Sequence, residues 1–234
     1  EESAEKLARS ERESAWREMA RQVAHEIKNP LTPMKLSIQH LRKAYQEHAP
    51  DWETRLDKTT QTLVTQIDSL ASIATAFSDF AKLPQPVNKK TEITTIIRST
   101  LSLFNQHPDI NFSFTIPEKE CFVFADEKQL SRVFINLLNN SVQSIPPDKT
   151  GLITIKLEPM PQWHKIEITD NGIGIGEEEK SKIFSPNFTT KSGGMGLGLA
   201  MVKNIIDSAN GKISFVSEKN KGTTFTIILP VCKD

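Results

Sequence analysis

The chain has 234 residues, and its 29 Lys and Arg residues balance 29 Asp and Glu residues, so the formal net charge is zero. With 37% hydrophobic and 25% charged residues, the composition is that of an ordinary globular protein. At roughly 100–200 residues per domain, this length predicts one large domain or two modest ones. The balanced charge argues against a general binder of nucleic acid or polyanions, and we expect no nucleic-acid partner.

Cysteine usage and hydropathy bear on the compartment. Cys121 and Cys232 are the only cysteines, too few for a disulfide framework and without metal-ligand spacing, which favours a reducing compartment. No run approaches the roughly 18–20 apolar residues of a membrane span, and no signal peptide opens the chain. The chain begins at Glu1 in a charged segment of helical pattern. We therefore expect a cytoplasmic piece of a longer protein, with a membrane link only through an upstream segment.

The glycines divide the chain into two parts. All ten lie from Gly151 onward, whereas the first 83 residues contain no glycine and three prolines. This asymmetry predicts a helical N-terminal part and a turn-rich C-terminal part. We expect a first domain at residues 1–83, with an entry coiled coil at 1–19, then a linker at 84–88 and a second domain at 89–234.

Apolar residues of the first domain recur every three or four positions in two series, which a turn at residues 48–51 separates. This pattern predicts two long helices in an antiparallel hairpin. Two helices alone bury little apolar surface, so we expect the hairpin to pair with a second copy in a homodimeric four-helix bundle. The first series is Ala20, Val23, Ile27, Leu31, Met34, Ile38, Leu41 and Tyr45, and the second is Leu56, Leu63, Ile67, Leu70, Ala74, Phe77 and Ala81.

The first helical series contains an irregularity. Val23, Ile27 and Leu31 follow one another in steps of four, and Pro30 lies within them. Because proline removes a helical hydrogen bond, we expect the helix to be weakened at this point. The nearby His25 lies off the apolar stripe and is expected to be exposed.

The second domain mixes helical and strand patterns without a regular βαβ alternation, which predicts an α+β sandwich. The expected helices are 92–104, 127–145 and 197–209, and the expected strands are 111–116, 121–124, 152–157, 165–169, 212–217 and 223–229.

Residues 25–30, His-Glu-Ile-Lys-Asn-Pro, form the first candidate site. An exposed neutral imidazole is a good nucleophile toward a phosphoryl group, and the adjacent Glu26 could orient the ring or take its proton. Asn29 lies one helical turn from His25 and could position a water molecule or a second substrate. A surface histidine beside a surface glutamate without function is the common alternative for such a pair.

Two amides share one face of the strongly apolar helix expected at residues 127–145. Asn136 and Asn140 are four residues apart, so their side chains point the same way. Amides are unfavourable in the middle of a helix unless they bind something. Coordination of Mg²⁺ by an amide carbonyl, together with phosphate oxygens, would be a suitable use. Satisfied amides in the core or on an exposed face are the alternative.

Residues 170–174, Asp-Asn-Gly-Ile-Gly, end a predicted strand. Asp170 could accept a hydrogen bond from an exocyclic amine, and Gly172 and Gly174 would let the backbone approach a flat base. An ordinary turn at the end of a strand is the alternative.

Residues 193–199, Gly-Gly-Met-Gly-Leu-Gly-Leu, run into a predicted helix and could present backbone N–H groups to phosphate. This loop is not a Walker A loop, because no Gly-Lys-Ser/Thr follows, and it lacks the βαβ context of a dinucleotide fingerprint. Just before it, Phe184 and Phe188 would anchor a lid from which Lys191 reaches toward phosphate. An ordinary surface loop with one buried phenylalanine is the alternative.

In this order and spacing the motifs resemble those of the sensor histidine kinases of two-component systems. The resemblance covers essentially the whole chain: residues 25–30 resemble the H box, 136–140 the N box, 170–174 the first glycine box, 184–191 the F box and lid, and 194–199 the second glycine box. Residues 16–33 and the Phe-Thr-Thr-Lys sequence at 188–191 are most similar to the nitrogen-regulation type.

This resemblance implies a helical hairpin for dimerisation and histidine phosphotransfer, followed by a Bergerat-fold ATP-binding α/β sandwich. It implies that His25 attacks the γ-phosphorus of ATP with Glu26 as general base, before the phosphoryl group passes to an aspartate of a response-regulator receiver domain. Glu26 and Asn29 also match the pattern linked in this family to dephosphorylation of that partner. Whether His25 is phosphorylated within one chain or across the dimer stays open.

The resemblance also assigns a nucleotide site. Asp170 would contact the adenine amine, and Asn140 would hold Mg²⁺ with help from Asn136. The full set of expected ATP-binding residues is Asn136, Asn140, Asp170, Gly172, Gly174, Thr190, Lys191, Gly194, Gly196, Leu197, Gly198 and Leu199. Gln143 and Ser144 depart from the family pattern, since many members carry a basic residue and an aromatic residue there.

Two other functions fit parts of the sequence. One is a catalytically silent dimeric signalling scaffold, which the intact motifs argue against. The other is a Bergerat-type ATPase that performs mechanical work, in which the His25–Glu26 pair would have no purpose.

Overall fold

The computed structural model describes residues 2–81, 86–104, 107, 109–185, 188–189 and 196–232, and within the two long helices it describes the side chains of residues 20–21, 23–71 and 73–74. Its contacts define two compact units, of which one includes residues 1–82 and the other residues 83–188 and 196–234. None of the helices in the described ranges combines the length and the apolar character that crossing a membrane requires.

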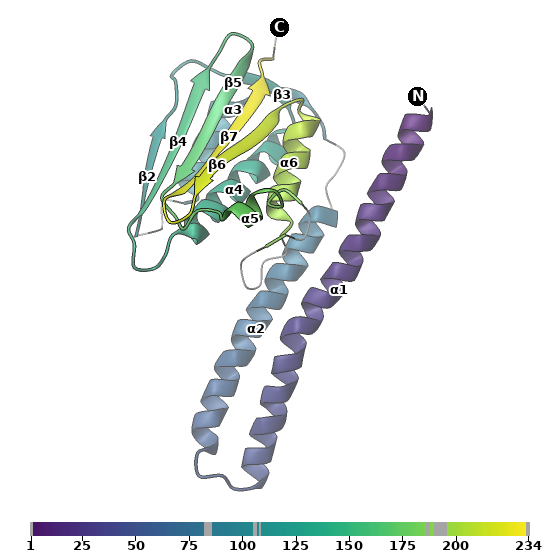
Figure 1. Cartoon of the computed structure of the whole chain (residues 1–234), viewed down its shortest axis with the longest axis vertical. Coiled ribbons are helices and arrows are strands. Elements are labelled where there is room, and N and C mark those ends of the chain that lie inside the picture. Colours follow the sequence, from purple (N-terminus) through teal and green to yellow (C-terminus); the bar gives the residue numbers. More distant parts are fainter. Residues whose placement is uncertain are drawn as a thin grey trace. The chain divides into compact units, whose positions relative to one another are not determined.

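The first unit is an antiparallel helical hairpin of α1 (Glu2–Gln46) and α2 (Trp52–Ala81) (Figure 1). Ala44 and Ile73 are buried in the described part of this unit, at 4% and 2% exposure, and so is the side chain of Pro30. The Ala49 N–H donates to the Ala44 carbonyl at 3.0 Å and closes the turn between the helices. The hairpin predicted from the apolar periodicity is confirmed.

The two prolines of α1 lie inside a helix that continues across both of them. Because a proline has no N–H, Pro30 and Pro33 cannot bond the carbonyls of Glu26 and Asn29, four residues earlier. The weakness expected near His25 therefore takes the form of lost helical hydrogen bonds, and the helix is not broken there.

The second unit is an α/β sandwich, as expected (Figure 1). A five-stranded sheet has the order β2-β4-β5-β7-β6, with β2 parallel to β4 and the other pairs antiparallel, and β1 pairs antiparallel with β3. The elements are β1 (Lys89–Glu92), α3 (Ile93–Ser102), β2 (Ile110–Thr115), β3 (Phe122–Ala125), α4 (Glu127–Ser144), β4 (Gly151–Pro159), β5 (Trp163–Asp170), α5 (Glu177–Lys180), α6 (Gly198–Ser208), β6 (Lys212–Glu218) and β7 (Gly222–Pro230).

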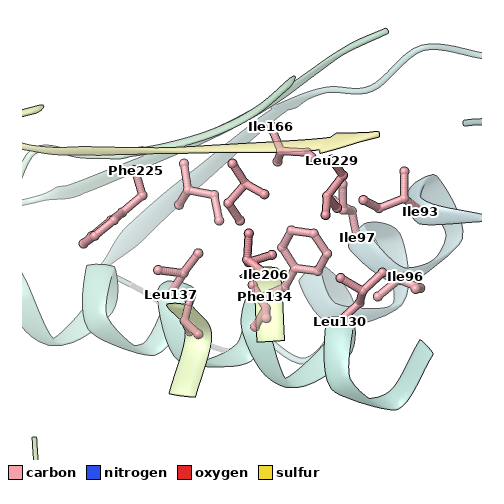
Figure 2. Packing of buried hydrophobic residues seen from close by; sticks show 14 of the residues in the cluster. Ile93, Ile96, Ile97, Leu130, Phe134, Leu137, Ile166, Ile206, Phe225 and Leu229 are labelled. Atoms are coloured by element: carbon pink, nitrogen blue, oxygen red, sulfur yellow. The ribbon is translucent and has the colours of Figure 1, made fainter. Parts of the chain in front are cut away.

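The core of this unit lies between the sheet and the helices α3, α4 and α6. Strand β4 alternates buried and exposed side chains, as a strand with one covered face must. Helix α4 contributes Leu130, Phe134 and Leu137, which point toward Ile166 and Phe225 of the sheet (Figure 2). This packing fixes α4 against β5, and the candidate site is built on these two elements.

Each predicted helix and strand of the second unit is present, with bounds within two residues of those expected. Two elements were not expected. Strand β1 has the sequence Lys-Lys-Thr-Glu, without apolar alternation, and α5 comprises only four residues.

Candidate functional site

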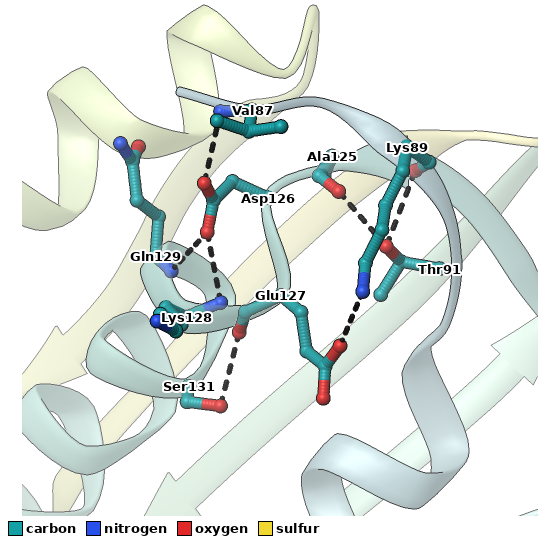
Figure 3. A network of polar contacts seen from close by, with 9 residues as sticks. All are labelled: Val87, Lys89, Thr91, Ala125, Asp126, Glu127, Lys128, Gln129 and Ser131. Atoms are coloured by element: carbon teal, nitrogen blue, oxygen red, sulfur yellow. Dashed lines mark hydrogen bonds and ion pairs between the residues drawn. The ribbon is translucent and has the colours of Figure 1, made fainter. Parts of the chain in front are cut away.

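Three helices of the second unit begin in two different ways. Glu92 caps α3 with a carboxylate that accepts backbone N–H groups of the first turn. Asp126 caps α4 in the same way (Figure 3). In contrast, α6 follows the glycine-rich loop and begins after Leu197, and no described side chain caps it. Its first N–H groups and the positive end of its dipole form a suitable anion site.

The start of α6 packs directly against α4. A Cβ atom on Gly198 would come within 2.8 Å of Oδ1 of Asn136, so only glycine fits this contact without a shift. Nδ2 of Asn136 donates to the Arg132 carbonyl at 2.9 Å, which fixes the amide on the helix surface. Leu197 is buried beside this junction and Leu199 is half-buried. The structure thus brings together part of the predicted amide pair and part of the predicted glycine loop.

Asp170 ends β5 with its side chain on the buried face of the strand, at 5% exposure. Its Oδ1 accepts the Gly172 N–H at 2.9 Å and the Thr223 N–H at 3.2 Å. Hydroxyl groups of α4 lie at similar distances, with Ser144 Oγ 3.2 Å from Oδ1 and Ser141 Oγ 3.3 Å from Oδ2. Burial raises the pKa of Asp170 above its ordinary value, and these hydrogen bonds, foremost that from Gly172, lower it in part.

Two glycines allow close packing around Asp170. A Cβ atom on Gly172 would lie 2.0 Å from Ser144 Oγ, and one on Gly222 would lie 1.9 Å from the Asp170 carbonyl. Gly222 also has a φ of +126°, which side chains rarely adopt. Gly174 packs against the Glu218 carbonyl in the same way. The backbone around Asp170 is therefore closed to larger residues.

Helix α4 connects the two halves of the site. On α4, Asn136 lies against the first residue of α6, and Asn140 is half-buried one turn later in the same helix. Ser144, one further turn along α4, lies beside Asp170. From residue 136 to residue 144, eight residues at 1.5 Å each span about 12 Å of helix. This arrangement can hold the phosphates of a nucleotide at one end and its base at the other.

The lid residues are described only in part. Phe184 packs edge-on against Phe215 and Phe225, with ring centroids 5.9 and 6.5 Å apart, and Phe188 is packed against the core. Both aromatic residues are thus packed against the core, and their anchoring of a lid stays a prediction. The predicted site residues Thr190, Lys191 and Gly194 lie outside the described residues, whereas Gly196 lies within them, two residues before the start of α6.

The predicted phosphoacceptor motif belongs to the first unit. His25 and Asn29 are exposed on α1, one turn apart, and Glu26 between them is half-buried. The exposure expected for His25 is confirmed. An imidazole in this position is accessible to a second domain or protein.

Magnesium fits the site through an amide oxygen. Among the described residues, no group of three His, Cys, Asp or Glu side chains could hold a metal ion. Mg²⁺ at nucleotide sites needs only one or two protein oxygens besides the phosphates and water. The amide carbonyl of Asn140 is a group of this type, and it lies on α4 between Asn136 and Ser144.

Some neighbours of Asp170 were not predicted from the sequence. Ser141, Ser144 and Thr223 donate to its carboxylate, and Lys149 lies one peptide group further away. Their side chains are ordinary in the sequence, and only the packing of α4 and β7 against β5 brings them to one point. The departure of Ser144 from the family pattern was the one signal that could have identified it.

The matches to family models cover both units. The model described as "His Kinase A (phospho-acceptor) domain" matches residues 15–86, and that described as "Histidine kinase-, DNA gyrase B-, and HSP90-like ATPase" matches residues 125–233. The fold and the site therefore define a histidine phosphoacceptor domain joined to an ATPase-type domain.

Individual relatives agree with this class. The chain is 34% identical over 213 residues to the nitrogen regulation protein NtrY of Azorhizobium caulinodans, which covers 88% of this chain and 28% of that protein. It is 33% identical over 230 residues to the sensor histidine kinase ZraS of Escherichia coli K12, covering 97% of this chain and 48% of that protein. The chain thus spans less than half the length of these two relatives.

Solved structures show the same relationship. A crystal structure of the histidine kinase ThkA in complex with the response regulator protein TrrA is similar over 99% of this chain and 66% of that chain, with 29% identity and a TM-score of 0.76. The catalytic domain of ThkA alone is 33% identical, covers 61% of this chain and 95% of that chain, and has a TM-score of 0.55. The chain belongs to the sensor histidine kinases of two-component systems, and NtrY-like kinases are among its relatives.

Proposed function

We propose that this chain binds MgATP in the second unit, transfers the γ-phosphoryl group to His25, and passes it to an aspartate of a response-regulator receiver domain. The observation that carries this proposal is that one chain combines an exposed His25 on a proline-containing helix with a site built for a nucleotide. Asp170 would bind the adenine amine, Asn140 and Asn136 would hold the metal and phosphates, and the start of α6 would face the phosphates.

The transfer step is an in-line displacement on phosphorus. The neutral imidazole of His25 attacks the γ-phosphorus, the bond to the bridging oxygen breaks, and ADP leaves. Glu26 takes the imidazole proton, and Mg²⁺ supplies charge neutralisation of the phosphates when it is bound. Most of the acceleration then comes from positioning and charge stabilisation, which fits a site assembled from rigid elements. Gly172, Gly174, Thr190, Lys191, Gly194, Gly196, Leu197, Gly198 and Leu199 complete the proposed nucleotide site.

We further propose a homodimer formed through the hairpin. Large apolar side chains of α1 and α2 remain exposed in the single chain, among them Leu31, Ile38 and Ile67 at 46%, 50% and 53%. Ile38 also lines an apolar groove of about 270 Å³ near the connection between the helices. A second hairpin would cover such a surface in a four-helix bundle. We also propose that this catalytic part lies in the cytoplasm and is linked to the membrane through an upstream segment.

Incubation with γ-labelled ATP and Mg²⁺ tests the kinase activity directly. We expect label on the parent, none on His25→Gln, and normal label on His40→Gln, which changes another exposed histidine of the same helix. Likewise, Asn140→Ala should lose labelling while Asn139→Ala, an exposed neighbour on α4, retains it. Label that persists on His25→Gln would refute the assigned acceptor, and acid-stable label would exclude a phosphohistidine.

Dephosphorylation of the partner is a second proposed activity. Glu26 and Asn29 lie on the same helix as His25, and the exposed Asn29 amide could orient a water molecule toward a phosphoaspartate. We expect Asn29→Ala to slow the release of phosphate from a phosphorylated receiver domain at least tenfold while autophosphorylation stays within about twofold. Equal loss of both activities would argue that Asn29 serves the kinase reaction instead.

A further inference from the structure

Lys149 lies in the connection between α4 and β4, close to the strand end that carries Asp170. Its Nζ donates a hydrogen bond to the carbonyl oxygen of Asn171. That carbonyl and the N–H of Gly172 belong to one peptide group, and this N–H donates to Oδ1 of Asp170 at 2.9 Å. A lysine ammonium is thus joined to the Asp170 carboxylate through a single peptide.

Successive hydrogen bonds of this kind are cooperative, because each one strengthens the next. A peptide whose oxygen accepts from a cation becomes more polarised, so that its N–H is a better donor to a carboxylate on the other side. The Gly172 N–H is the closest of the donors to Asp170, since the Thr223 N–H and the two hydroxyls lie at 3.2–3.3 Å. Lys149 therefore acts on the shortest of these hydrogen bonds.

The serine hydroxyls provide less directional support. Ser144 Oγ lies 2.7 Å from the Ser141 carbonyl and 3.2 Å from Oδ1 of Asp170, so its one proton serves two acceptors. Ser141 Oγ is 3.3 Å from Oδ2. The backbone N–H groups of Gly172 and Thr223 have fixed directions, and the Gly172 N–H, at 2.9 Å against 3.2 Å, makes the shorter hydrogen bond to Oδ1.

The surrounding backbone holds Lys149 in place. The Asn171 side chain accepts the Leu152 N–H at 2.8 Å and donates to the Thr150 carbonyl at 3.1 Å. The Lys149 N–H itself donates to the Pro146 carbonyl at 3.1 Å. Because these bonds fasten the connection to the end of β5, the half-buried lysine is fixed to the peptide it contacts.

We propose that Lys149 is a positioning residue for base recognition, which acts through the Asn171–Gly172 peptide to orient Asp170 toward a purine that carries an exocyclic amine at position 6. This inference rests on the proposed function of the second unit as an ATP site. It assigns to the site a preference for adenine over purines without that amine, and it makes part of the preference depend on Lys149.

Equilibrium binding to the full chain tests this with two nucleotides, ATP and purine riboside 5′-triphosphate, which lacks the 6-amine. We expect the parent to bind ATP at least tenfold more tightly than the analogue. Lys149→Met should reduce this preference three- to tenfold while binding of the analogue changes less than twofold. Lys149→Arg, which keeps a cationic donor, should restore most of the preference. Lys156→Met, on an exposed side chain of β4, should match the parent.

The outcomes separate the inference from the function on which it rests. A Lys149→Met variant that loses equal affinity for both nucleotides, or that keeps the parent preference, overturns the inference while leaving ATP binding in place. A parent that binds neither nucleotide refutes the proposed function and this inference with it. Melting curves of each variant show whether it is folded, and if Lys149→Met is unfolded, the preference of Lys149→Gln decides in the same way.

Discussion

The N–H of Val87 donates to Oδ2 of Asp126 at 2.9 Å, and Oδ1 of the same carboxylate caps α4 through the N–H groups of Lys128 and Gln129 (Figure 3). One side chain thus fastens the segment that precedes β1 to the first turn of the helix that carries Asn136 and Asn140. Lys89, the first residue of β1, and Glu127, the first residue of α4, add an ion pair of 2.8 Å. The beginning of the second unit is therefore tied to the helix that connects the two halves of the site.

Substitution of Asp126 should separate the two roles. Asp126→Ala removes the cap and the bond to Val87, and should lower the free energy of unfolding by about 1–2 kcal/mol. Asp126→Asn keeps a good capping oxygen but gives up one acceptor, so it should lose less than half of that amount. Urea unfolding measures both, with Asp207→Ala, on an exposed residue of α6, as the control. Equal losses for Ala and Asn would mean that the bond to Val87, and not the cap, provides the stability.

Glu92 should make the second unit sensitive to acid. Burial would raise its pKa, but hydrogen bonds from the hydroxyls and N–H groups of Thr94 and Thr95 outweigh it and lower the pKa from 4.5 to about 2. A carboxylate whose pKa is lower in the folded state stabilises it above the unfolded pKa, and this stability is lost as the pH falls through the folded pKa.

We therefore expect the parent to lose stability between pH 4.5 and about 2 more steeply than Glu92→Gln does. At neutral pH the variant should be less stable by about 1 kcal/mol, because the amide nitrogen of Gln cannot accept the hydrogen bonds that Oε2 of Glu92 accepts from Thr95. Unfolding curves across this pH range measure the difference, and Glu118→Gln, on an exposed residue, is the control. Parallel curves for the parent and Glu92→Gln would contradict the prediction.

His164 should add a second acid-sensitive step at higher pH. It is 5% exposed on the inner face of β5, and in the described part of the chain neither ring nitrogen lies within hydrogen-bond geometry of a partner. Burial lowers its pKa below 6.5, more than the Phe122 carbonyl and the Glu92 charge raise it. The unfolded chain then binds the proton more readily, so stability falls as the pH drops below 6.5.

Replacing His164 by Leu should remove this step, because no titratable group remains there. At pH 8 the variant should lie within about 1 kcal/mol of the parent, as it gives up no hydrogen bond of the imidazole. Melting temperatures at pH 8, 7, 6 and 5 compare the two chains, with His107→Gln as the exposed histidine control. If His164→Leu follows the parent curve between pH 7 and 5, the protonation of His164 has no part in stability.

Two glycines near the site should respond differently to alanine. A Cβ atom on Gly172 would lie 2.0 Å from Ser144 Oγ, whereas one on Gly176 would meet only the Glu179 carboxylate at 3.4 Å. Gly172→Ala should therefore weaken ATP binding at least tenfold and lower the melting temperature, and Gly176→Ala should do neither. Adding Ser144→Gly should restore part of the loss, because it removes two of the three close contacts of the new methyl group. Full ATP binding by Gly172→Ala would show that the backbone at residue 172 moves freely.

The sequence predicted most of the elements because their patterns are local. The alternation in β4 and the apolar face of α4 belong to single segments, and the turns between them carry Gly, Pro or Asn. Strand β1 escaped prediction because its Lys-Lys-Thr-Glu sequence takes its strand conformation from pairing with β3. The four residues of α5 are too few for a helical period.

For the site, local motifs marked Asn136, Asp170, Gly172 and Gly198, and their roles remain predictions. The motifs could not reveal how Asp170 is held. Its donors come from α4, β7 and the turn after β5, at distances in sequence of 26 to 53 residues for Ser144 and Thr223. Such contacts depend on how helix and sheet pack, which no single segment encodes.

Strand β5 places His164, Ile166, Ile168 and Asp170 on one face, because each is two residues from the next. Insertion of one residue in the middle of this strand would turn either Asp170 or His164 from the core side to the open side of the sheet. The alternation of side chains along the strand, more than its composition, thus keeps Asp170 facing α4. Changes in chain length should be accepted in the turn at residues 160–162 and rejected between residues 164 and 170.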